Sequence, residues 1–264
     1  MGGATMEFSI GRHRIAVNVA GRDALLLQAR HKLEAAQGFA VATLNLDHLV
    51  KIAASQDFAA AYARHDMVVA DGQPIVWLSW LARKKVSLAP GSDMVEPLCA
   101  VARDTGASVA LIGSTEEVLQ TSARALEGAV PGLNVALHMS PSRGFDPTGP
   151  EADMILANLE ASGARLCLLA LGAPKQEIFA ARAREIAPNV GFISIGAGLD
   201  FIAGHQTRAP SWMRSLALEW LWRMLSSPSR MVPRYVRCFA VLPGLVVSAL
   251  RLRMQEEAEV TYIR

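Results

Sequence analysis

Four short motifs in this chain place polar or charged side chains directly after apolar stretches of strand length. They are Thr43-Leu44-Asn45, Ala70-Asp71-Gly72, Gly172-Ala173-Pro174-Lys175-Gln176-Glu177 and Gly196-Ala197-Gly198-Leu199-Asp200. An open α/β sheet binds its ligands beyond the carboxyl ends of its strands, so each motif is a candidate part of a binding site. Together they offer carboxylates, amides and backbone N–H groups, which suit a substrate with hydroxyl and phosphate groups.

Asp71 is the candidate catalytic group. The apolar stretch before it delivers the carboxylate to the edge of the sheet, and Gly72 permits a tight turn into the next helix. A carboxylate in this place can act as a general base toward a hydroxyl group. An N-cap or an Asx-turn explains the spacing equally well. For Asp93, which follows Gly91 in a similar arrangement, the spacing favours a helix cap.

Thr43 and Asn45 lie two residues apart at the end of an apolar strand, so their side chains face the same way on an extended chain. Together they could bind a sugar or a base. Alternatively, Asn45 or Asp47 caps the helix that follows, and the spacing alone favours this cap.

The segment that begins at Gly172 follows the most apolar strand and is a candidate for phosphate binding. Pro174 suits the first helical turn, and exposed backbone N–H groups beside Lys175 would attract a diphosphate. Gln176 belongs to the same turn. Glu177 is interpreted mainly as a complement to the helix dipole.

The glycine pair Gly196 and Gly198 superficially resembles a dinucleotide-binding fingerprint. Phe201 stands where the third glycine belongs, and the motif follows a late strand rather than the first, so it is weak support for NAD. A turn that needs small residues near a ligand explains the glycines better. Asp200 could hold a ribose or sugar hydroxyl, or it could cap this turn.

Apolar stretches of strand length alternate with helix-length segments along most of the chain. The predicted strands cover residues 14–19, 39–44, 67–70, 108–112, 134–138, 166–171 and 190–195. Segments with helical spacing cover residues 22–36, 73–82, 93–104, 115–129, 151–161 and 174–187. The alternation predicts an α/β fold with a Rossmann-like, mostly parallel sheet flanked by helices. Gly113 ends one of these strands at a turn, and the Ser-, Pro- and Gly-rich residues 140–150 predict a long surface loop.

The pattern changes after residue 203, which predicts an α/β domain (1–203), the candidate catalytic domain because it carries the motifs above, and a helical appendage (204–264). The appendage has nine Arg and four Glu, with Trp212, Trp220 and Trp222 among them. Arg and interfacial aromatic residues suit an amphipathic element that rests on an anionic membrane surface. A core helix with a solvated outer face is the alternative.

The appendage is predicted to contain two helices. One begins near Pro210 and ends at about Leu225, and the other follows Pro228 and Pro233. The apolar stretch Cys238–Leu250 within the second is interrupted by Pro-Gly and is predicted to be too short to span a bilayer.

Composition excludes several classes of protein. The net charge of +2 argues against a nucleic-acid binder. Three cysteines far apart in sequence give no disulfide framework, which fits a reducing cytoplasm, and the N-terminus shows no signal pattern. The six histidines lack zinc-site spacing and no Asp-X-Asp triplet is present, so the sequence predicts neither a metal site nor a cofactor.

Eight motifs in order, from about Phe39 to Arg237, resemble those of the WecG/TagA/CpsF glycosyltransferase family. Four are the motifs described above, and the others are Gly91-X-Asp93, Arg208-Ala-Pro210, Glu219-Trp220-X-X-Arg223 and Pro228-X-Arg230…Arg234-Tyr235. A single motif of this kind is a weak signal, whereas eight in the family order are highly specific.

The resemblance implies an inverting, metal-independent glycosyltransferase at the cytoplasmic face of the cell membrane. It implies transfer of a hexose or N-acetylhexosamine-type sugar from a UDP-sugar to an undecaprenyl-diphosphate-linked sugar, and it allows self-association. Residues 1–203 are then the catalytic domain that binds the nucleotide sugar, and Asp71 is the general base. The substrate-binding set comprises Thr43, Asn45, Gly72, Asp93, Gly113, Gly172, Pro174, Lys175, Gln176, Glu177 and Asp200, together with Arg223, Arg230 and Arg234 from the appendage.

Two other classes of function stay open from the residues alone. A nucleotide-binding oxidoreductase is suggested by the doubly wound pattern, and tight NAD binding with hydride transfer would identify it. A non-catalytic membrane adaptor is suggested by the Arg- and Trp-rich tail, and function retained after substitution of Asp71 would identify it. The fold does not decide among the three.

Overall fold

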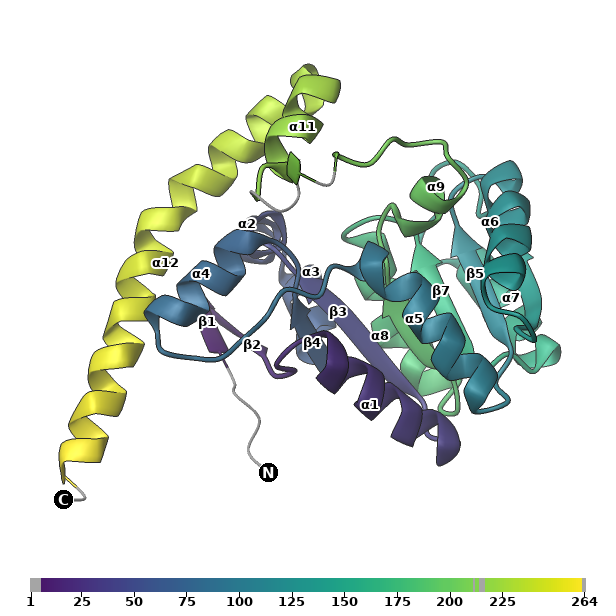
Figure 1. The fold of residues 1–264 in the computed structure, drawn as a ribbon, viewed down its shortest axis with the longest axis horizontal. Helices are drawn as coiled ribbons and strands as arrows, with labels where there is room; N and C mark the ends of the chain where they lie inside the picture. The colour runs from purple at the N-terminus through teal and green to yellow at the C-terminus, as the bar shows by residue number, and fades with distance from the viewer. Residues whose placement is uncertain (1–5, 211, 214–216, 263–264) are drawn as a thin grey trace.

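The centre of the molecule is a sheet of six parallel strands in the order β4-β3-β8-β7-β5-β6 (Figure 1). The structure is a computed structural model that describes residues 6–210, 212–213 and 217–262, without the side chains of Arg230 and residues 256–262. The strands are β3 (Phe39–Leu44), β4 (Met67–Ala70), β5 (Val109–Gly113), β6 (Val135–Met139), β7 (Leu166–Ala170) and β8 (Gly191–Ser194). The predicted α/β fold is confirmed, because these bounds lie within one residue of the predicted strands.

Helices cover both faces of this sheet. One face carries α1 (Arg22–Glu34), α5 (Gly91–Asp104), α6 (Glu116–Ala129) and the short α9 (Gly198–Ile202). The other carries α7 (Pro150–Ser162), α8 (Lys175–Ile186), α2 (Leu46–Ala54) and α3 (Gln56–Ala63), with α4 (Gln73–Leu81) in the same core as α2 and α3. In β3, Val41 faces the first core, while Ala40 and Ala42 face the second. Both faces are buried, which explains why the strand is apolar except for Thr43.

A separate hairpin precedes the main sheet. The sequence places residues 14–19 among the main strands, but β2 (His13–Val17) pairs antiparallel with β1 (Met6–Ile10), which the sequence pattern does not reveal. Alternating burial along both strands leaves one face exposed, as is usual for antiparallel pairs. Asn18 ties the hairpin to the main sheet, because its side chain accepts a hydrogen bond from the N–H of Val68 at 2.7 Å.

The C-terminal appendage contains α11 (Glu219–Ser226) and α12 (Pro228–Tyr262). Trp220 of α11 packs edge-on against Tyr235 and Phe239 of α12, with ring centroids 6.0 and 5.9 Å apart. The predicted first helix includes residues 211 and 214–216, which lie outside the described residues. Its described C-terminal part begins at Glu219.

α12 is one continuous helix that passes through Pro243, in agreement with the predicted second helical segment, and it ends later, at Tyr262. By length and composition alone, its segment Met231–Gln255 could cross a membrane, with a mean hydropathy of 1.5, so the apolar part of the helix is longer than the predicted stretch Cys238–Leu250. Only 17% of the apolar window is buried. Cys238, Leu245 and Ala249 form its buried side and pack against the hairpin, α2 and α4.

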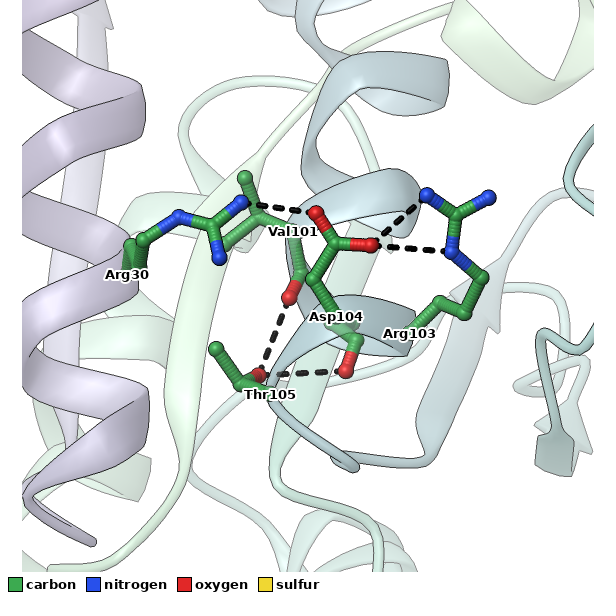
Figure 2. A network of polar contacts seen from close by, with 6 residues as sticks. Arg30, Val101, Arg103, Asp104 and Thr105 are labelled. Carbon is green, nitrogen blue, oxygen red and sulfur yellow. Dashed lines mark hydrogen bonds and ion pairs between the residues drawn. The ribbon is translucent and has the colours of Figure 1, made fainter.

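A surface network joins α1 to α5 through Asp104 (Figure 2). Arg30 donates to one carboxylate oxygen of Asp104 at 2.7 Å, and Arg103 donates to the other at 2.6 and 3.0 Å. The hydroxyl of Thr105 donates to the carbonyl of Val101 at the end of α5. Because these ion pairs are exposed, they contribute little to stability, and the apolar residues beneath them hold the two helices on the sheet.

Gly113 is required by the packing of β5 against β7. Its φ is 119°, and a Cβ atom there would lie 2.4 Å from the backbone of Ala170. We therefore expect Gly113→Ala to lower the free energy of unfolding by more than about 1 kcal/mol. Gly128→Ala in α6 is the control, because its Cβ meets no atom within 4 Å, and it should raise stability by up to about 1 kcal/mol. Urea denaturation of both variants measures the difference, and an unchanged midpoint for Gly113→Ala would contradict this account.

A candidate active site at the carboxyl edge of the sheet

A cavity of about 860 Å³ opens at the carboxyl ends of β3, β4, β7 and β8 and reaches α11 and the start of α12. The strand order reverses between β3 and β8, and open α/β sheets bind their ligands at such a switch point. Eight of the predicted site residues line this cavity: Thr43, Asn45, Asp71, Gly172, Gln176, Asp200, Arg223 and Arg234.

Asp71 lies at the end of β4 and lines the cavity. It does not cap the next helix, because Gly72 occupies the N-cap position of α4 and no side chain caps that helix. Burial raises the pKa of Asp71 to about 6, and the negative charge of Glu219 adds to this effect, while the charge of Arg223 and a hydrogen bond from Asn45 oppose it. A carboxylate with a pKa near neutrality is suited to removing a proton at physiological pH.

Asn45 combines the two roles that its spacing allows. Its Oδ1 accepts the N–H of His48 at 3.0 Å and so caps α2, while its side chain also hydrogen-bonds to Asp71. Thr43, which is almost completely buried, lines the same cavity. His48 lies 2.6 Å from the hydroxyl of Tyr62, and burial lowers the pKa of His48 to about 3. His48 is therefore neutral at physiological pH.

Gln176 and Glu177 form a buried pair at the start of α8. The amide of Gln176 donates to Oε1 of Glu177 at 2.7 Å, and its own oxygen accepts the N–H of Gly196 at 3.3 Å. Gln176 lines the cavity, whereas Glu177 lies behind it, and its Oε2 has no hydrogen-bond partner among the described residues. Burial raises the pKa of Glu177 to about 7. Glu177 therefore orients Gln176, a role that its sequence position does not reveal.

Removal of the Glu177 side chain is expected to lower the free energy of unfolding by about 1–3 kcal/mol, because Gln176 loses its buried acceptor. Glu177→Ala should therefore be less stable and turn over more slowly than the wild type. Glu177→Gln keeps a carbonyl acceptor and should recover most of both losses. Urea denaturation and steady-state rates test this, and a Glu177→Ala variant with wild-type stability would show that the contact does not hold Gln176.

Asp47 ties the appendage to α2 beside the cavity. Its carboxylate pairs with Lys51 of the same helix at 2.8 Å and with Arg234 of α12 at 3.0 Å. Burial raises the pKa of Asp47, but a hydrogen bond from Lys51 and the two positive charges outweigh burial and leave the pKa below its usual value. Lys51 and Arg234 both line the cavity and present positive charge to it. Lys51 was not predicted as a site residue, although its i,i+4 spacing from Asp47 indicates an ion pair.

Two further arginines gather around Phe201. The guanidinium carbons of Arg208 and Arg223 lie 5.2 and 6.0 Å from the centroid of this ring. Arg223 also donates to Glu219 at 2.6 and 3.1 Å, and Arg208 pairs with Asp93. Asp93 does not cap α5, contrary to the expectation from its spacing. Its carboxylate instead fixes Arg208 at the cavity wall.

Several predicted residues do not line the central cavity. Gly72 supplies a positive φ of 116° at the turn into α4, and Gly113 supplies close strand packing. Arg230 lies in α12, but its side chain is outside the described residues. The described residues of the predicted set that lie away from the cavity are Gly72, Asp93, Gly113, Pro174, Lys175 and Glu177.

The cavity also has lining residues that were not predicted to bind substrate. Arg208 and Glu219 belong to the motifs that carry the family resemblance, so their position in those motifs was the available signal. Trp222 encloses one side and donates its indole N–H to the carbonyl of Thr207 at 3.2 Å. The unpredicted set includes His48, Lys51, Ser92, Phe201, Arg208, Glu219 and Trp222.

No group of three or more His, Cys, Asp or Glu side chains in the described part of the chain is arranged to hold a metal ion. The three carboxylates that line the cavity have other partners. Asp71 is hydrogen-bonded by Asn45, Asp200 accepts the hydroxyl of Ser114 at 3.1 Å, and Glu219 pairs with an arginine.

Comparison with protein families identifies a match over nearly the whole chain. The family model described as "Glycosyl transferase WecG/TagA/CpsF family" matches residues 12–258 of the 264. The matched region includes β2, the whole main sheet, the cavity and most of α12.

Proposed function

Because this chain belongs to the WecG/TagA/CpsF glycosyltransferase family, whose members act in cell-surface polysaccharide synthesis, we propose that it transfers a hexose or N-acetylhexosamine-type sugar from a UDP-sugar to an undecaprenyl-diphosphate-linked sugar. The transfer proceeds with inversion and without a metal ion. The observation that carries this proposal is the position of Asp71, a carboxylate with a pKa of about 6, in a cavity lined by four cationic side chains.

The proposed reaction is a single displacement. Asp71 takes the proton from an acceptor hydroxyl, and the oxygen attacks the anomeric carbon from the side opposite the UDP group. The new C–O bond forms as the bond to the diphosphate breaks, and UDP leaves with the electron pair. One displacement inverts the configuration at the anomeric carbon. Thr43, Asn45 and Asp200 lie where they can hydrogen-bond the hydroxyl groups of the two sugars.

Positive side chains replace a metal ion in stabilising the departing UDP. Lys51, Arg208, Arg223 and Arg234 line the cavity, and the buried Nε–H groups of Arg208 and Arg234 have no partner within the described part of the protein. A diphosphate would satisfy these donors with charge-assisted hydrogen bonds. Such preorganised donors act where negative charge develops in the transition state.

We infer that the enzyme acts at the cytoplasmic face of the cell membrane, as a peripheral protein. Residues 1–203 form the catalytic unit, and residues 204–264 contact the membrane and complete the site with Arg223 and Arg234. Support comes from the family, which is membrane-associated, and from the apolar, weakly buried α12. Self-association is compatible with this arrangement.

The proposal is tested by a UDP-release assay with a panel of UDP-sugars, with and without a short-chain prenyl-diphosphate-linked sugar, in EDTA. Acceptor-dependent release of UDP from one donor would support the transferase activity, and release in the presence of EDTA would support its independence of metal ions. Release only after addition of a divalent cation would contradict metal independence. NMR of the product determines the anomeric configuration, and retention would exclude the single displacement.

The pH dependence of kcat/KM follows from the pKa of Asp71. The base must be ionised to accept a proton, and burial raises its pKa to about 6, so kcat/KM should fall below pH 6 and level off above it. An unshifted carboxylate would instead keep the enzyme active down to about pH 4. Steady-state rates from about pH 4.5 to 8 distinguish the two profiles.

A further inference from the structure

Helix α4 presents two tryptophans to solvent. Trp77 and Trp80 are 51% and 62% exposed, and they lie three residues apart on one side of the helix. The opposite side of α4, which includes Ile75 and Leu78, is buried in the core. Large aromatic side chains are rarely so exposed on a soluble protein unless the surface binds a partner.

The same surface is strongly basic. Between Gly72 and Ser92 the chain has Arg83, Lys84 and Lys85 but no acidic residue, and between Trp220 and Gln255 it has six Arg and no acidic residue. These two segments carry nine positive charges. Because the whole chain has a net charge of +2, the remainder carries −7. Positive charge is therefore concentrated on α11, on α12 and on the residues that directly follow α4.

Helix α4 lies beside α12, and the two helices pack together (Figure 1). Both begin beside the cavity, α4 just after Asp71 and α12 near Arg234. The exposed apolar residues of α12 are Val232, Val236, Phe239, Val247, Leu250 and Met254. Two neighbouring helices that begin at the site thus both expose apolar side chains, and basic residues lie on α12 and directly after α4.

We propose that Trp77 and Trp80 of α4, with the exposed Arg83 and Lys85 that follow this helix, form a second contact with an anionic membrane surface, outside the appendage. Tryptophan favours the membrane interface because its ring is apolar and its indole N–H can reach polar headgroups. Lysine and arginine beside it are attracted to anionic lipids. This proposal rests on the proposed function at a membrane. A contact through α4 would turn the α4 side of the protein toward the bilayer, from which a lipid-linked acceptor could enter the cavity.

Cosedimentation with lipid vesicles tests this contact. The full chain is compared on vesicles of phosphatidylcholine alone and of equal parts phosphatidylcholine and phosphatidylglycerol. Trp77→Ser/Trp80→Ser should lower binding to the anionic vesicles about tenfold or more, because two interfacial anchors are lost. Arg83→Gln/Lys85→Gln should weaken binding to anionic vesicles only. The control, Leu27→Ser/Met154→Ser, removes equally exposed apolar residues of α1 and α7 and should bind as the wild type does.

Further measurements separate this surface from the active site. UDP release with the short-chain acceptor in solution should be unchanged in both α4 variants. Equal vesicle binding by the wild type and both α4 variants would overturn the proposal without affecting the proposed function. Sedimentation velocity tests whether this surface instead binds a second copy of the chain. The proposal would be overturned if the wild type were a dimer, Trp77→Ser/Trp80→Ser made it a monomer, and vesicle binding stayed unchanged.

Discussion

Replacement of Asp71 by Asn is expected to lower kcat by about 10²–10⁴-fold, the usual effect of losing a general base. The amide has nearly the same shape and can still meet the hydrogen bond from Asn45, but it cannot take a proton from the acceptor. Substrate binding should change little, because the cations that hold the diphosphate are untouched. Single-turnover rates at saturating donor and acceptor measure the effect on the chemical step.

The same substitution should make the protein more stable at neutral pH. Burial raises the pKa of Asp71 from 3.8 to about 6 in the folded state, so the free energy of unfolding falls as the pH rises from about 4 to about 6 and stays lower above that. The neutral amide of the Asp71→Asn variant does not ionise, so this penalty is removed. Asp57→Asn, at an exposed carboxyl in the first turn of α3, is the control; it should leave the rate unchanged and, through the helix dipole, lower stability by no more than about 1 kcal/mol. An Asp71→Asn variant with wild-type turnover would exclude the general base.

The main sheet could be predicted because its strands are buried on both faces. Every residue of β3 is buried, so the strand appears in the sequence as a continuous apolar stretch between turn residues. The hairpin β1–β2 gives a weaker signal, because each strand is short and half-exposed. Its position against α12 depends on contacts between the two ends of the chain, which local patterns do not contain.

The predicted second helix of the appendage is confirmed, although it contains Pro243. Proline inside a helix removes a backbone hydrogen bond and crowds the preceding turn, so the helix needs other contacts to stay continuous there. In the structure, Cys238 lies before this proline and Leu245 and Ala249 after it, and all three pack into one core. Burial on both sides of the proline holds the two halves of the helix in line.

Part of the site could be predicted from strand ends alone. Thr43 and Asp71 lie at the ends of neighbouring parallel strands, so their convergence follows from the topology. Lys51 lies within a helix, and Arg208 lies in the segment that follows α9, so their approach depends on how separate elements pack. The pairing of Asp93 with Arg208 likewise joins residues far apart in the chain, and helix-cap statistics cannot reveal it.

The family match decides among the three classes of function that the residues left open. The glycosyltransferase family model matches residues 12–258, which include most of the α/β domain and most of the appendage. The match supports neither the oxidoreductase nor the adaptor. The appendage also takes part in the site, because Arg223 and Arg234 line the cavity and Arg234 is held by Asp47 of α2. An element that contacts the membrane and lines the cavity would link catalysis to the place where the acceptor resides.

Substitution of Arg223 by Gln should lower kcat by about 10²–10³-fold, the effect expected when a preorganised donor to the leaving group is lost. It should also move the acidic limb of the pH profile to higher pH. The positive charge of Arg223 lowers the pKa of Asp71, and Glu219, left without its partner, raises it, so both changes act in the same direction. Arg237→Gln removes an exposed arginine of α12 that does not line the cavity and should change neither property. A loss of rate without a shift of the pH profile would place Arg223 at the diphosphate but away from Asp71, whereas wild-type rates would remove it from the site.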